Sequence, residues 1–264
     1  MSRFSSFFSS RFPSRLFAGL RARAPAAAAH LSSGLRNLMP SSCALCGQQA
    51  PDALCESCQM QFFGQAQTRC RICAMPLPCA DKELRCGDCL REPPAFDATA
   101  VAADYVAPLD QLVLALKFGG KLALAPLFAR LQADALLHFR AAPLPTLLTG
   151  VPLSAMRLMT RGFNQSLEIA RPLSRLTGIA LEPQLLMRVR DTRPQALLAP
   201  QQRRRNIAGA FDVSPQCMSQ VAGRHIGVVD DVITTGQTLN EIAATLKRYG
   251  AIRVTNLVFA RTLR

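Results

Sequence analysis

Four pairs of cysteines, each pair separated by two residues, lie between positions 43 and 89 of the chain. A Cys-x-x-Cys turn lets two thiolates face one ion, and two such turns close a tetrahedral zinc site. The sequence therefore predicts about two zinc ions, each in a closed four-thiolate site that holds structure and leaves no position for a substrate. The predicted ligands are Cys43, Cys46, Cys55, Cys58, Cys70, Cys73, Cys86 and Cys89.

The connecting loops are shortest if the first turn shares a zinc ion with the second and the third turn shares one with the fourth. A crossed pairing of the first turn with the third stays open. Disulfides and an iron–sulfur cluster are the rival interpretations, but disulfides need an oxidising compartment, and we see no segment that directs export. We therefore expect reduced thiolates in the cytoplasm. Cys79 and Cys217 are expected to be small apolar side chains without a metal role.

The cysteine turns divide the chain into three parts. Residues 1–42 carry six arginines and no acid, which is typical of a flexible basic tail or of a basic amphipathic helix. Residues 43–92 form the zinc module, and Pro93 and Pro94 mark its boundary with a domain over residues 93–264. The formal net charge of +14 predicts attraction to polyanions or phosphorylated ligands. The sequence contains no apolar run long enough for a transmembrane span.

Strand-like and helix-like patterns alternate after the linker. This alternation favours an α/β fold with a parallel sheet that has helices on both faces. The expected strands are 97–105, 146–153, 183–190, 224–231 and 252–260, and the expected helices are 108–118, 124–139, 164–178 and 238–250.

The stretch "VVDDVITTGQT" (228–238) joins a predicted strand to a predicted helix. Ligands bind beyond the carboxyl ends of strands in such sheets, so we expect Asp230 and Asp231 at the rim. Backbone N–H groups at the helix start, with Gly236 allowing close approach, predict a cradle for a phosphate. The two carboxylates would then accept hydrogen bonds from the hydroxyls of the attached sugar.

This stretch resembles the ribose-5-phosphate loop of type I phosphoribosyltransferases. Together with "RGFNQ" (161–165) and the cysteine turns, it makes residues 43–261 resemble the ComF family, the competence-associated phosphoribosyltransferase-like proteins of bacteria. The resemblance implies a type I phosphoribosyltransferase-like parallel sheet with an N-terminal double zinc ribbon. It also implies phosphoribosyl pyrophosphate and Mg²⁺ as ligands.

The resemblance implies a role for each matching residue. Asp230 and Asp231 hold the ribose hydroxyls and, with Arg161, are the candidate catalytic residues. The segment after the strand at 146–153 meets the pyrophosphate, where bidentate guanidinium groups suit the leaving group. The implied ligand contacts outside the two acids are Arg157, Arg161, Asn164, Gln165, Thr234, Thr235, Gly236, Gln237 and Thr238. The implied lid residues are Arg193, Gln195, Arg203 and Asn206.

Three functions remain open at this point. The first is a transferase in nucleotide metabolism or DNA uptake, whose catalysis would be positioning and charge stabilisation. The second is a protein that handles single-stranded DNA and retains the sugar-phosphate site, although aromatic residues for base stacking are scarce. The third is a zinc adaptor that docks on a competence helicase or on membrane machinery, at the periphery of the inner membrane. The sequence does not name an acceptor.

Overall fold

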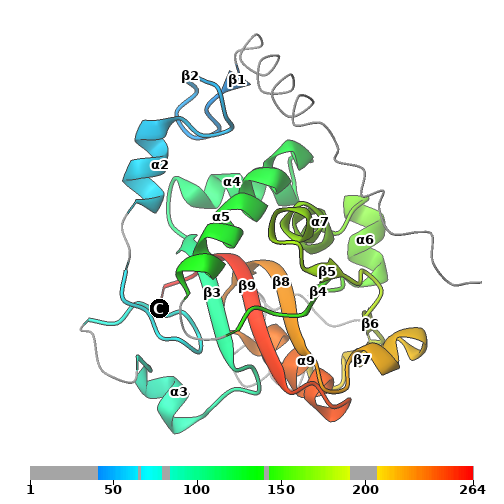
Figure 1. Cartoon of the computed structure of the whole chain (residues 1–264). Helices are drawn as coiled ribbons and strands as arrows, with labels where there is room; N and C mark the ends of the chain where they lie inside the picture. The colour runs from blue at the N-terminus through cyan, green and yellow to red at the C-terminus, as the bar shows by residue number, and fades with distance from the viewer. Residues whose placement is uncertain (1–40, 65–66, 79–83, 140–142, 191–206, 264) are drawn as a thin grey trace, which may run out of the picture. The chain divides into compact units, whose positions relative to one another are not determined.

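The computed structural model describes residues 41–64, 67–78, 84–139, 143–190 and 207–263. Within these residues, five parallel strands form the central sheet in the order β3-β9-β8-β4-β5 (Figure 1). The predicted parallel sheet is therefore confirmed. Its strands are β3 (Ala98–Asp104), β4 (Leu147–Gly150), β5 (Ala180–Leu181), β8 (His225–Ile233) and β9 (Arg253–Arg261).

Helices cover both faces of this sheet, as the alternating pattern predicted (Figure 1). One core contains α4 (Leu109–Lys117), α5 (Ala125–His138) and α7 (Gln165–Thr177). There, Phe128 of α5 stacks on Phe259 of β9, with 3.7 Å between ring centroids. A separate core packs α9 (Gln237–Arg248) against Val228 and Val254. These two cores fix the sheet between its helices by apolar burial.

Local signals account for the ends of α7. Asn164 caps the helix, because its Oδ1 accepts a hydrogen bond from the Ser166 N–H at 3.0 Å. Gly178 ends it in the left-handed conformation, with a φ of 72°. The next helix toward the N-terminus, α6 (Ala155–Arg161), was expected as loop. Its start is marked by Ser154, whose Oγ accepts a hydrogen bond from the Arg157 N–H at 3.4 Å.

Two strand predictions need correction. The strand expected over residues 183–190 is the short β6 (Leu186–Arg188), which pairs antiparallel with β7 (Phe211–Val213) outside the central sheet. The edge of the central sheet is formed by β5, which was not predicted because two residues carry no periodicity. The remaining short elements are η1 (Leu122–Leu124) and η3 (Pro215–Gln220).

The zinc module has little regular structure of its own. Its elements are the antiparallel pair β1 (Ser41–Ser42) and β2 (Gln49–Ala50), and the helices α2 (Glu56–Phe63) and α3 (Gly87–Arg91). Strand β1 begins inside the segment 1–42 that we assigned to the basic tail, and the rest of that segment lies outside the described residues. None of the helices in the described ranges has the length and apolar character that crossing a bilayer requires.

The order of the strands creates a crevice at the centre of the sheet. From β4 the chain passes through α6 and α7 to β5, whereas from β8 it passes through α9 to β9 on the opposite side. The neighbouring strands β4 and β8 therefore lead away from each other, and such a switch point is where open α/β sheets bind ligands.

Both acids of the motif lie inside β8, because this strand continues to Ile233, whereas we expected it to end at Asp231. Asp230 still reaches the rim because the neighbouring strand β4 ends at Gly150, which pairs with Val229. On the other side, β9 extends as far as β8 and pairs Ile233 with Arg261.

Candidate functional site

The cysteines form two separate four-thiolate groups in the described chain. In each group the sulfur atoms all lie within 4.8 Å of one another. Neighbouring turns approach to 3.7 Å between the Sγ atoms of Cys46 and Cys55, and to 3.5 Å between those of Cys73 and Cys86. A tetrahedron with Zn–S bonds of 2.3 Å has edges of about 3.8 Å, so both groups fit zinc.

The first cysteine turn thus joins the second, and the third joins the fourth, which confirms the sequential pairing and excludes the crossed one. We name the group of Cys43, Cys46, Cys55 and Cys58 the first zinc site, and the group of Cys70, Cys73, Cys86 and Cys89 the second zinc site. Cys217 is buried in the core around α9, as expected of a small apolar side chain. Cys79 lies outside the described residues.

A cavity of about 1090 Å³ opens at the switch point, beyond the carboxyl ends of β4 and β8. We call it the switch-point cavity. Most of the residues that the sequence singled out meet there, although they come from two segments far apart in the chain, 157–165 and 230–238. The predicted residues that line it are Arg157, Arg161, Gln165, Asp230, Asp231, Thr234, Gly236, Gln237 and Thr238.

Asn164 and Thr235 are placed differently. Asn164 donates from Nδ2 to the carbonyl oxygen of Val151 at 3.0 Å, in addition to capping α7. Both ends of its amide are thus used for structure, and we drop it from the ligand contacts. Thr235 lines a second cavity of about 780 Å³ on the zinc-module side of the loop. Its buried Oγ1 has no hydrogen-bond partner among the described residues.

The two acids have different environments. Asp230 accepts hydrogen bonds from Ser166 Oγ at 2.9 Å and from the Asp231 N–H at 3.0 Å. Burial, and then the neighbouring Asp231, raise the pKa of Asp230 to about 7. Asp231 is buried, and its Oδ2 lies 3.0 Å from Lys117 Nζ. That oxygen accepts no aligned hydrogen bond within the described structure, so the contact with Lys117 is an ion pair only.

The loop after β8 has the features of an anion site. Gly236 caps α9 with a φ of 79°, a conformation that other residues rarely adopt. No side chain in the described structure caps this helix at Gly236, and the positive end of a helix favours an anion. The buried Arg261 donates from Nη1 to the carbonyl oxygens of Ile233, at 3.1 Å, and Thr234. The carbonyl oxygens on both sides of the Ile233–Thr234 bond are thereby held by a buried cation. The convergence of the amides of 234–238 stays a prediction.

Two arginines of α6 line the switch-point cavity together with the acids. Arg161 donates from Nη1 to Gln165 Oε1 at 2.5 Å, and its guanidinium lies 5.2 Å from the centre of the Phe118 ring. Burial lowers the pKa of Arg161, an effect that Asp231 opposes. Arg157 lies one turn earlier on the same short helix. The cavity therefore combines an acid pair, an open helix end and two guanidinium groups.

Sequence reasoning missed several residues that hold this arrangement. Lys117 pairs with Asp231, Ser166 donates to Asp230, and the buried Gln132 donates from Nε2 to the Asp230 carbonyl oxygen at 2.9 Å. Arg261 was missed as well, although a charged residue at the end of an apolar strand is a signal in the sequence. The proposed lid residues Arg193, Gln195, Arg203 and Asn206 lie outside the described residues.

Comparison with known proteins finds a domain family that matches the zinc module and relatives that match most of the chain. A double zinc ribbon domain model matches residues 34–90. The DNA utilization protein YhgH of Salmonella typhi is 37% identical over 225 residues, which cover 80% of this chain and 97% of that protein. Competence protein F of Haemophilus influenzae is 32% identical over 204 residues, covering 76% of this chain and 87% of that protein.

Among solved structures, a glutamine phosphoribosylpyrophosphate amidotransferase from B. subtilis aligns with 51% of this chain and 26% of its own, at 21% identity and a TM-score of 0.34. This structural similarity is too distant to assign the fold class, which follows from the strand order and the helix layers. The double zinc ribbon and the extent of identity to the DNA utilization and competence proteins show that the chain belongs to the ComF family.

Proposed function

We propose that the chain binds phosphoribosyl pyrophosphate with Mg²⁺ in the switch-point cavity and transfers the phosphoribosyl group during the use of imported DNA. The observation that carries this proposal is the uncapped start of α9 beside the Asp230–Asp231 pair, at the point where β4 and β8 diverge. The names of the relatives, DNA utilization protein and competence protein, support the cellular context.

Each part of the cavity suits one part of this ligand. The start of α9 and the hydroxyls of Thr234 and Thr238 take the 5-phosphate, since helix N-termini favour anions. Asp230 and Asp231 accept hydrogen bonds from the ribose diol. Arg157 and Arg161 face the pyrophosphate, for which guanidinium groups offer bidentate donors.

The acid pair also fits a divalent cation. Carboxylate oxygens are ligands that Mg²⁺ accepts, together with the phosphates of its substrate. Burial and Asp231 raise the pKa of Asp230 more than the nearby Lys117 lowers it, and a bound cation would favour the charged carboxylate further. When bound with the diphosphate, Mg²⁺ would neutralise negative charge on the leaving group.

The described histidines do not serve as acid or base in this scheme. His138 lies at the end of α5 with its Nδ1 2.7 Å from the Asp134 carbonyl oxygen, and His225 lies buried at the start of β8. Catalysis would therefore rest on holding the ribose between the acids and residues 234–238, which we call the phosphate loop, and on the two arginines stabilising the departing charge.

Calorimetric titration with phosphoribosyl pyrophosphate and Mg²⁺ tests the proposal. We expect saturable binding by the wild-type protein and at least a tenfold loss in the Asp230→Asn/Asp231→Asn double variant. The matched control is Asp134→Asn, which removes an exposed acid of α5 and should bind like the wild type. Absence of binding by the wild-type protein, or equal binding by the double variant, would reject the site.

Binding of single-stranded DNA is the second candidate function, and a specific feature favours it. Phe118 is 74% exposed at the mouth of the switch-point cavity, with the guanidinium of Arg161 over its ring. An exposed aromatic ring beside a cation is a stacking platform for bases. A truncation, Phe118→Ala, should weaken oligonucleotide binding measured by fluorescence anisotropy, whereas Leu137→Ala, at an exposed position of α5, should not. Equal affinities in the two variants would remove this function.

A further inference from the structure

The two zinc sites pack against different cores of the molecule. Cys43 and Cys58 of the first zinc site are buried in the core that contains α4, α5 and α7. Cys73 of the second zinc site and its neighbour Ile72 pack instead against the core around α9. Because α9 begins at the phosphate loop, the second zinc site shares a core with the candidate ligand site.

Hydrogen bonds and an ion pair attach the second zinc site to the edge of the central sheet. On its N-terminal side, the Arg71 carbonyl oxygen accepts a hydrogen bond from the Thr99 N–H of β3 at 3.1 Å. Nearby, Arg69 Nη1 lies 2.8 Å from Asp104 Oδ1, at the end of the same strand.

The segment 92–97, which we call the connector, attaches the other side of the second zinc site to α9. It follows α3, the helix that carries Cys89. The Ala95 N–H donates to Asn240 Oδ1 in the first turn of α9 at 2.7 Å. Asp97 accepts from Lys247 Nζ at 2.9 Å and from the Val254 N–H at 2.8 Å. The connector is thus fixed at both ends of α9.

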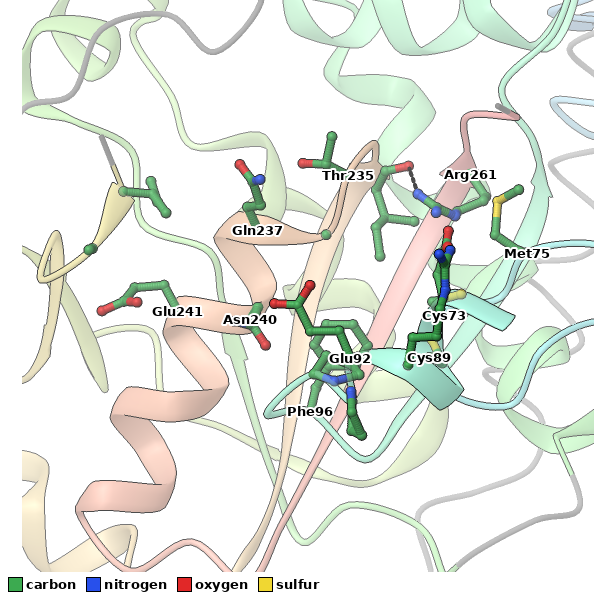
Figure 2. Close-up of a pocket in the computed structure, with 18 residues that line it drawn as sticks. Cys73, Met75, Cys89, Glu92, Phe96, Thr235, Gln237, Asn240, Glu241 and Arg261 are labelled. Atoms are coloured by element: carbon green, nitrogen blue, oxygen red, sulfur yellow. Dashed lines mark hydrogen bonds and ion pairs between the residues drawn. The ribbon is translucent and has the colours of Figure 1, made fainter. Parts of the chain in front are cut away.

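Between these two anchor points, Phe96 packs beneath the phosphate loop. Its side chain is 4% exposed, and a Cβ atom at Gly236 would lie 3.7 Å from its Cζ. Figure 2 shows Phe96 and Asn240 in the wall of the cavity of about 780 Å³, whose lining also includes Cys73 and Cys89. This cavity separates the cysteines from Gly236. The connector, which continues directly from α3, therefore links the zinc site to the loop through its contacts with Asn240 and Gly236.

We propose that Phe96 is a positioning residue that makes the order of the phosphate loop depend on the second zinc site. Zinc holds the turns of a module that is too small to fold on apolar burial alone, so its loss releases the connector. Without Phe96 beneath it, the loop around Gly236 would have to be ordered by the ligand, and that ordering weakens binding. The effect on affinity rests on the proposed phosphoribosyl pyrophosphate site, whereas the effect on loop order does not.

Two pairs of variants test the dependence. Cys86→Ser removes a ligand of the second zinc site and Cys46→Ser a ligand of the first. Phe96→Ala removes the ring beneath the loop while both zinc sites stay intact, and Phe63→Ala removes a ring that packs on the α5 side, 6.3 Å from the ring of Phe259. Each full-length variant is measured by zinc content, by hydrogen exchange over residues 233–241, and by titration with phosphoribosyl pyrophosphate and Mg²⁺.

We expect Cys86→Ser and Phe96→Ala to exchange faster over residues 233–241 and to bind the ligand about 5- to 50-fold more weakly, a common size for coupling between sites. Cys46→Ser and Phe63→Ala should stay within about twofold of the wild type in both measurements. Phe96→Leu, which keeps a bulky apolar side chain, should restore most of the affinity lost in Phe96→Ala.

Unchanged exchange of the loop in Phe96→Ala would overturn the inference, and so would equal acceleration in Cys46→Ser and Cys86→Ser. If Cys86→Ser does not fold, Phe96→Ala, with its zinc retained, decides the question. A wild-type protein that does not bind phosphoribosyl pyrophosphate would end the proposed function, but hydrogen exchange would still judge the role of Phe96.

Discussion

Asp230→Asn should stabilise the unliganded protein, and the structure gives the size of the effect. Burial and Asp231 raise the pKa of Asp230 from its ordinary 3.8 to about 7. At about 1.4 kcal/mol per pKa unit, ionising Asp230 in the folded protein costs about 4 kcal/mol of stability above pH 7. Asparagine keeps an oxygen for the hydrogen bond from Ser166 and carries no charge.

The pH dependence gives the sign of this effect. Asp230 has a higher pKa in the folded than in the unfolded state, so the folded protein binds more protons between pH 4 and 7. The contribution of Asp230 to stability is therefore fully present below about pH 4 and is lost as the pH rises through 7. Asp230→Asn removes this loss, so its advantage over the wild type should be near zero at pH 4 and largest at pH 8.5.

Urea unfolding of both proteins from pH 4 to 8.5 measures the difference, with zinc content determined at each pH, because protonation of the thiolates at low pH releases zinc from both proteins alike. We expect Asp230→Asn to be more stable by about 2–4 kcal/mol at pH 8.5, with about 4 kcal/mol as the upper limit because Asp230 keeps some exposure to water, which screens its charge. Asp134→Asn, at an exposed position of α5, should show a small difference that does not vary in this way. A variant that is less stable than the wild type at pH 8.5, or a difference that is flat with pH, would refute the reasoning.

Three further predictions concern residues around the loop and the sheet. Gly236→Ala should lower the free energy of unfolding by about 1 kcal/mol, because alanine is strained at a φ of 79°, and should weaken ligand binding in calorimetry. Arg261→Met should destabilise the protein by about 2–4 kcal/mol in urea, because the carbonyls of Ile233 and Thr234 lose a buried charged donor; a loss below 0.5 kcal/mol would contradict this. Burial, and then Arg253, lower the pKa of His225 to about 4, so stability should fall as the pH drops from about 6.5 to 4. His225→Gln should reduce that fall in acid unfolding curves, and an unchanged curve would count against it.

The elements with strong local signals could be predicted from the sequence. The helix over 164–178 was correct to within a residue at each end, because Asn164 and Gly178 mark its boundaries by their own chemistry. The long apolar strands and the alternation with helices were also sufficient to predict a parallel sheet. The two-residue β5 and the short α6 were missed because their stability comes from packing and not from their own pattern.

The candidate site shows the same division. The sequence by itself determined which residues carry the chemistry: eight cysteines in four turns, and an acid pair followed by a glycine at a helix start. Only the tertiary structure decided which turns share a zinc site, and that Asp231 faces Lys117 while Asp230 faces Ser166. It also placed Phe96 beneath Gly236. The physical reason is that spacing along the chain reports local geometry, whereas the burial and partners that set a pKa or hold a loop come from segments far apart in sequence.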